Sequence, residues 1–104
     1  MVRVRTIYRE TQGRLEEIGT HEEGAWINLV NPTPAEIEET VSWFQIPPDF
    51  LTDPLDVDER ARVEREGGSI LIVLRTPHRD PPGADIPYTT LPLGIILTHN
   101  VTIT

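Results

Sequence analysis

An acidic run between Asp53 and Glu59 (Asp-Pro-Leu-Asp-Val-Asp-Glu) is the one segment of this chain whose residue types indicate a particular chemistry. Carboxylate oxygens are the ligands that hard cations such as Mg²⁺ and Ca²⁺ take. An EF-hand is rejected, because its loop needs glycine at the sixth position, where this chain has Asp58. Two interpretations stay open: a weak Mg²⁺ site that uses one or two carboxylates, or a solvated acidic turn with ion pairs to Arg60 and Arg62. The residues alone favour the acidic turn.

No other residue set in the sequence fits a catalytic site. Cysteine is absent, which excludes disulfides and thiolate metal sites. Neither a nucleophile elbow nor a zinc-binding H-E-x-x-H motif is present, and Gly67-Gly68 is not followed by the lysine and helix of a phosphate loop. His21, His78 and His99 are far apart in predicted loops and turns, and we interpret them as surface residues. The chain is therefore not predicted to be an enzyme.

Length and charge narrow the class of partner. At 104 residues the chain forms one domain or less, with a net charge of −8. Nucleic acids and anionic membrane surfaces are disfavoured, whereas divalent cations and basic protein surfaces remain plausible ligands. The start of the sequence lacks the apolar core of a signal peptide, and the longest apolar runs fall far short of the ~20 residues of a membrane span. We expect a soluble chain.

A helix that precedes the acidic run has a clear N-terminal signature. Thr33 is a good N-cap, Pro34 suits the first helical position, and Glu36 completes a capping box. The apolar stripe of Ile37, Val41 and Phe44 predicts a helix to Phe44, with one face buried.

Prolines divide this helix from a second one that leads to Asp53. Pro47-Pro48 ends the first helix and begins a short second helix through Leu51. Pro54 biases Asp53 away from helical geometry, so the second helix is predicted to end near Thr52. The acidic run would then form an irregular corner.

Strands are predicted on both sides of the helices. Alternating residues from Val2 to Ile7 indicate a half-exposed strand, and Gly67-Gly68 indicates a hairpin. Residues 70–74 and 93–97 are largely apolar, which predicts central strands covered on both faces. A loop rich in proline, glycine and aspartate is predicted between Pro77 and Pro87. The predicted strands are 2–7, 14–18, 25–30, 60–66, 69–76, 88–97 and 101–104. The order β-β-β-α-α-β-β-β-β indicates a mixed sheet in an α/β or α+β arrangement.

A distributed pattern of short motifs runs through most of the chain. It comprises Trp26-Ile27-Asn28 before the capped helix, Phe44-x-Ile46-x-Pro48, Leu51-x-Asp53-x-Leu55, Arg60-x-Arg62-Val63-Glu64, the apolar strand at 70–74, and Leu93–Leu97. In this order and spacing the pattern resembles the cytoplasmic N-terminal domain of the CorA family of magnesium and cobalt transport proteins.

The resemblance implies a larger protein than this chain. Residues 1–104 would be a truncated N-terminal domain of the α/β/α type, without the stalk helix and the two membrane helices of the family. The whole protein would be a homopentamer with this domain at the cytoplasmic face of the cell membrane. The implied function is that of a soluble, cation-sensing regulatory domain of a magnesium and cobalt transporter. The alternative is a stand-alone acidic interaction module with the same fold. Alone, the chain is expected to self-associate and cover its open apolar surface.

The resemblance also assigns a role within the acidic run. Asp53 matches a family aspartate that helps to bind a regulatory Mg²⁺ between subunits, with the partner carboxylate on a neighbouring subunit's stalk. Asp53 would thus supply half of a weak Mg²⁺ site. Two residues depart from the family pattern: Pro54 directly follows the aspartate, and Thr52 stands where some members have a second acidic residue.

Overall fold

The structure is a computed structural model that describes residues 4–104, so the first residues of the predicted strand at Val2 lie outside it. Seven strands form one mixed sheet in the order β2-β1-β3-β7-β6-β5-β4. The pair β3–β7 is parallel, and the other neighbours are antiparallel. The elements are β1 (Val4–Thr11), β2 (Arg14–Ile18), β3 (Trp26–Val30), α1 (Pro34–Phe44), α2 (Pro48–Thr52), a 3₁₀ turn η1 (Asp53–Leu55), β4 (Arg62–Glu66), β5 (Ser69–Arg79), β6 (Tyr88–Leu97) and β7 (Thr102–Ile103). The predicted element order and α/β class are confirmed.

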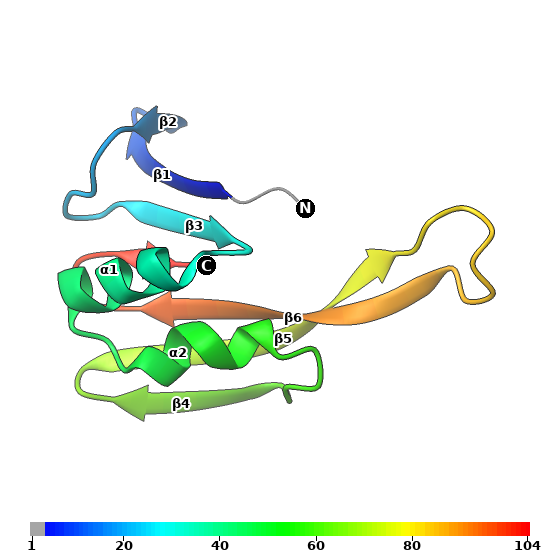
Figure 1. The fold of residues 1–104 in the computed structure, drawn as a ribbon. Coiled ribbons are helices and arrows are strands. Elements are labelled where there is room, and N and C mark those ends of the chain that lie inside the picture. The colour runs from blue at the N-terminus through cyan, green and yellow to red at the C-terminus, as the bar shows by residue number, and fades with distance from the viewer. Residues whose placement is uncertain (1–3) are drawn as a thin grey trace.

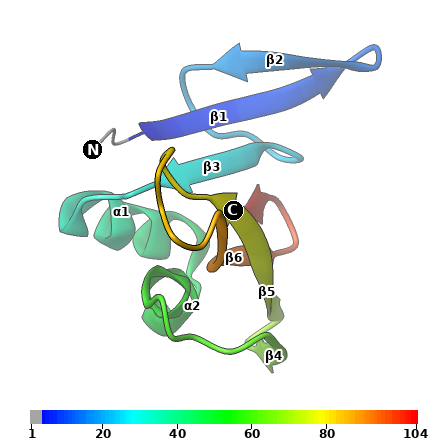
Figure 2. The same cartoon turned by 90° about the vertical axis from the view of Figure 1, so that its right-hand side faces the viewer.

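Both helices lie on the same face of the sheet (Figures 1 and 2). The capping box of α1 forms as predicted: the Glu36 amide donates to the Thr33 hydroxyl over 3.1 Å, and the Thr33 amide donates to the Glu36 carboxylate over 2.8 Å. The helix ends at Phe44, and Gln45, which caps it, has a left-handed backbone with a φ of 51° that turns the chain toward α2.

The hydrophobic core lies between this helical layer and the centre of the sheet. Side chains from the sheet that are at most 2% exposed include Ile27, Leu71, Val73, Ile96 and Ile103. Ile46, Phe50 and Leu51 cover them from the helical layer and are themselves buried. The predicted stripe of Ile37, Val41 and Phe44 also packs against this core. Burial of this apolar surface is the main force that fixes α2 and the following turn on the sheet.

The opposite face of the sheet carries apolar side chains that no helix of the described chain covers. Successive residues of a strand point to opposite faces, so the neighbours of buried Leu71 and Val73 face away from the helices. Three cross-strand pairs form this face: Ile70–Leu97, Ile72–Ile95 and Leu74–Leu93. Leu74, Leu93 and Leu97 are 43%, 37% and 38% exposed. The prediction that these strands are covered on both faces is therefore wrong for residues 4–104. We call the six residues of these pairs the open face.

Strands β5 and β6 form an arm that extends well beyond the rest of the sheet (Figure 1). Their pairing continues to Arg79–Tyr88, so part of the loop predicted from Pro77 is strand. Pro77 and Pro92 both fit within these strands because β4 pairs with β5 only as far as Val73, and β7 pairs with β6 only near its end. In the arm each strand has one unpaired edge, where a proline costs no sheet hydrogen bond.

Candidate functional site

Asp53 lies at the junction between α2 and η1, and its backbone is helical. Its φ and ψ are −57° and −46°, and its amide donates to the carbonyl of Asp49. The prediction that Pro54 would bias Asp53 away from helical geometry is therefore wrong, although α2 does end at Thr52. Pro54 stands in the first turn of η1, where a missing N–H leaves no hydrogen bond unmade. The chain thus turns tightly at Asp53.

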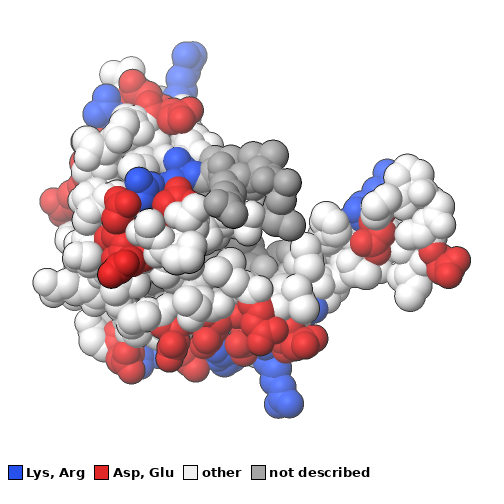
Figure 3. Space-filling model, viewed as in Figure 1, with Lys and Arg blue, Asp and Glu red and all other residues white. Residues whose placement is uncertain are grey.

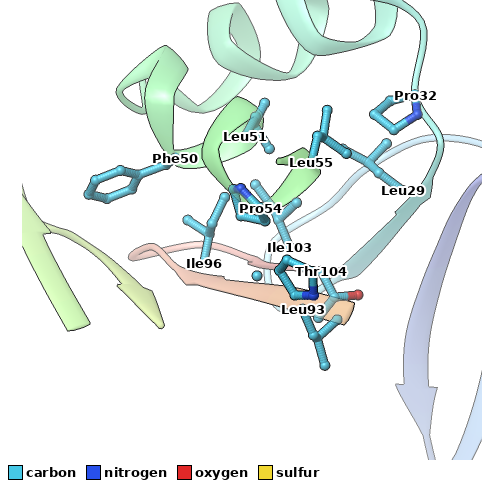
Figure 4. A pocket seen from close by; sticks show the side chains of 12 residues that line it. Leu29, Pro32, Phe50, Leu51, Pro54, Leu55, Leu93, Ile96, Ile103 and Thr104 are labelled. Carbon is cyan, nitrogen blue, oxygen red and sulfur yellow. The ribbon is translucent and has the colours of Figure 1, made fainter. Parts of the chain in front are cut away.

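Packing against β6 fixes this turn in place. Gly94 on β6 lies directly beneath the Pro54 ring: a Cβ atom on residue 94 would be 2.5 Å from Pro54 Cγ and 3.0 Å from Pro54 Cβ. Figure 4 shows Pro54 and Leu51 above this strand, whereas the side chain of Leu93 points to the other side. A small apolar cavity of about 100 Å³ remains between η1 and the sheet. It is lined mainly by leucine, isoleucine and proline and offers no charged group for a ligand.

One guanidinium group connects the Asp53 carboxylate to two other acidic side chains. Nη2 of Arg62, on β4, lies 2.8 Å from Oδ2 of Asp53. Nε of Arg62 lies 3.0 Å from the Glu64 carboxylate, and Nη1 donates to the Glu59 carboxylate. The side chains of Arg62 and Asp53 are 25% and 32% exposed, so this network is only partly solvated. Arg62 is one of the two arginines that the sequence predicted as ion-pair partners of the acidic run.

The environment of Asp53 disfavours its charge despite this ion pair. Burial raises the pKa of the Asp53 carboxyl, and the negative charge of Glu59 adds to that effect. Arg62 lowers the same pKa, but by less than burial raises it. The pKa of Arg62 is raised, chiefly by its hydrogen bond to Glu64. Asp53 is therefore a carboxylate that a further positive charge would stabilise.

Backbone contacts hold the rest of the acidic run. The Asp58 amide donates to the Asp56 carboxylate over 2.9 Å, an Asx-type turn. Nη1 of Arg75, on β5, donates to the carbonyl oxygens of Val57 and Glu59 over 2.6 and 3.0 Å. Arg75 was not predicted from the sequence, where it is one arginine in a strand. These contacts account for an ordered acidic turn.

The predicted ion pair to Arg60 is not among the salt bridges found within residues 4–104, where the Arg60 amide instead donates to the Glu59 carboxylate. Acidic side chains gather along the edge of the sheet at β4 and the preceding loop (Figure 3).

Within residues 4–104, no group of three or more histidine, cysteine, aspartate or glutamate side chains is arranged to hold a metal ion. His21 packs against the rings of Trp43 and Phe44, with centroids 4.7 and 4.9 Å apart. His78 is in the β5–β6 arm, and His99 lies beside Gly68. Within the described residues, Asp53 is thus a single, partly exposed carboxylate paired with Arg62.

Solved structures define the class of this fold. The complete structure of the CorA magnesium transporter from Methanocaldococcus jannaschii matches all of this chain with a TM-score of 0.76 and 23% identity. The structure of the soluble domain of CorA from the same organism matches with a TM-score of 0.72 and 23% identity. This chain covers 32% of the first and 41% of the second, so it spans less than half of either. No curated protein sequence matches it significantly. The fold is that of an α/β domain found in CorA structures.

The family follows from the sequence match. The family model described as CorA-like Mg²⁺ transporter protein matches residues 21–104. The chain therefore belongs to the CorA-like Mg²⁺ transporter family, and the predicted resemblance is confirmed. None of the helices in residues 4–104 has the length and apolar character that a membrane crossing requires.

Proposed function

We propose that residues 1–104 are part of the N-terminal, cytoplasmic domain of a longer transporter of Mg²⁺ and related divalent cations such as Co²⁺. The match of the family model to residues 21–104 is the observation that carries this proposal. The chain also aligns in full with only 32% of a complete CorA structure. A domain of this kind would regulate transport rather than conduct ions.

Cation sensing at Asp53 is the regulatory role that the geometry supports best. The carboxylate lies at the rim of the molecule, in a turn that is packed onto the sheet by Pro54 and Gly94. Mg²⁺ usually keeps several waters and takes only one or two carboxylates. Asp53 would supply one of these, and a carboxylate of a neighbouring subunit in a homopentamer would supply the other.

The mechanism of sensing follows from thermodynamic linkage between cation binding and the arrangement of the subunits. A cation that bridges two subunits stabilises the arrangement in which their carboxylates are close together. When the cation dissociates, two like charges face each other, and the subunits separate or become asymmetric. The raised pKa of Asp53 agrees with this role, because its charged form is poorly compensated within one chain.

Limited proteolysis of the longer protein tests the proposal. Mg²⁺ should protect the wild type from cleavage, and the variant Asp53→Ala should lose most of that protection. Asp58→Ala is a matched control, since Asp58 is exposed in the same turn and has the same charge. If Asp53→Ala keeps the full protection, Asp53 has no part in sensing. The coding sequence after Thr104 should continue into a long charged helix and two apolar spans.

A stand-alone interaction module remains the alternative function. The open face and the net charge of −8 favour it, since a basic, partly apolar partner would complement both. A stop codon directly after Thr104 would support the module and contradict the transporter domain.

A further inference from the structure

The hydrogen-bond ladder between β3 and β7 is still regular at Thr104, the last residue of this sequence. The Thr104 amide donates to the Ile27 carbonyl over 2.9 Å, and the Leu29 amide donates to the Thr104 carbonyl over 2.8 Å. In a parallel ladder these bonds recur at every second residue, so the Leu29 carbonyl is the next acceptor for β7. The edge of β3 is therefore ready to pair with at least two more residues.

The alternation of side chains fixes the direction in which the residue after Thr104 would point. Ile103 faces the helices and is 1% exposed. Thr104 faces the opposite way, where its hydroxyl accepts from Nε1 of Trp26 over 2.8 Å and donates to Oδ1 of Asn28 over 3.0 Å. Successive residues of a strand point to opposite faces. A residue that continues β7 would therefore point toward the helices, like Ile103.

The strand register also gives the neighbours of that residue. Strand β7 is parallel to β3 and antiparallel to β6, and Ile103 lies opposite both Ile27 and Ile96. Two residues beyond Ile103, the same pairings lead to Leu29 on β3 and Gly94 on β6. The side chain of this residue would thus project between Leu29 and Gly94, under the helical layer.

The small apolar cavity beneath η1 lies at this place. Leu29 and Gly94 both line it, together with Ile103 and, from the turn, Pro54. Figure 4 shows the side chains of Leu29, Pro54 and Ile103 around it. Its volume of about 100 Å³ is of the size of one aliphatic side chain, and no charged group lines it. Gly94 has no side chain with which to fill the space.

We propose, on the basis of the longer protein given above, that the residue after Thr104 is valine, isoleucine or leucine and that its side chain fills this cavity. A polar side chain there would be buried without a hydrogen-bond partner, which is unfavourable. The occupied cavity would pack the turn at Pro54 from below. The segment that leads from β7 into the rest of the transporter would then contact the turn that carries Asp53 directly.

Xenon is a suitable probe, because it enters dry apolar cavities of about this size. The experiment compares the 104-residue chain with the same chain extended by its next four natural residues. In the 104-residue chain, xenon should shift the methyl NMR signals of Leu29, Leu55 and Ile103, which line the cavity. In the extended chain these shifts should fall by about fivefold or more.

Two variants of the extended chain separate filling of the cavity from a general effect of a longer strand. Alanine in place of the first residue after Thr104 should restore the xenon shifts and lower the urea midpoint by about 1 M. Alanine in place of the second residue is the matched control. That residue points to the other face of the sheet, so the xenon shifts should stay small.

The outcomes distinguish this inference from the proposed function. A charged residue after Thr104, no xenon shift in the 104-residue chain, or equal shifts in both chains would overturn the inference and leave the transporter domain standing. A stop codon after Thr104 would overturn both. If either short chain does not fold, a crystal structure of the longer protein decides: the side chain should lie within about 4 Å of Leu29 and Pro54. A side chain that points to the opposite face would contradict the inference.

Discussion

Replacing Gly94 by alanine should destabilise the protein, because the new methyl group would collide with the turn that carries Asp53. The Cβ atom would lie 2.5 Å from Pro54 Cγ and 3.0 Å from Pro54 Cβ, closer than carbon atoms approach without displacement. The Pro54 ring has little freedom to move away, since it belongs to η1 and its own ring closure fixes its φ. Relief therefore requires the whole turn to shift from the sheet.

The magnitude follows from two opposing effects. Overpacking of this kind typically costs about 1–3 kcal/mol. Alanine at an extended, non-strained position restricts the unfolded chain and returns about 0.4–1 kcal/mol. The net loss should be about 1–2 kcal/mol, which lowers the melting temperature of a domain of this size by about 4–16 °C.

Urea denaturation followed by tryptophan fluorescence measures this change. Gly94→Ala should lower the midpoint without changing the slope, as expected for lost stability with an unchanged native surface. In the background of Pro54→Ala, which removes the Cγ atom, the same substitution should cost less by about 1 kcal/mol. Gly19→Ala is a matched control, because nothing lies within 4 Å of its Cβ position. A Gly94→Ala variant as stable as the wild type would refute the idea that Pro54 can pack on β6 only when residue 94 is glycine.

Two further predictions concern the surface. A hydrogen bond from Arg9 holds the pKa of the Glu16 carboxyl below its usual value, so Arg9→Gln should raise that pKa in an NMR titration. A lowered pKa contributes stability above the unfolded-state pKa that is lost as the pH falls through the folded-state pKa, so acid should destabilise the wild type slightly more than Arg9→Gln. The 104-residue chain should self-associate through the open face, and light scattering should give a mass above 11.8 kDa. Leu74→Lys should reduce that mass and Val57→Lys should not; a strictly monomeric wild type at high concentration would count against this contact.

The helix cap and the ion pair of the acidic run could be predicted from the sequence, because both depend on residues close together in the chain. Thr33, Pro34 and Glu36 cap α1 through contacts within one turn, and they do so as predicted. The ion pair of the acidic run with Arg62 was also predicted in kind, since opposite charges a few residues apart are within reach.

Features that depend on pairing between distant segments could not be predicted from the sequence. Pro77 and Pro92 suggested a loop and an irregularity, yet both fit a strand, because their free edges exist only once the ends of β4 and β7 are known. The contact of Gly94 with Pro54 joins residues 40 positions apart. Its only signal was a glycine within an apolar strand, which often marks a close approach of another segment. Arg75 gave no signal, since its acceptors are the hydroxyl of Thr90 and backbone carbonyls of segments distant in sequence.

Crystals of the longer protein grown with Co²⁺ would test cation sensing at Asp53 most directly. An anomalous difference map should show a peak beside the Asp53 carboxylate, between two subunits. Cobalt bound elsewhere in the protein, with no peak at Asp53, would contradict the account.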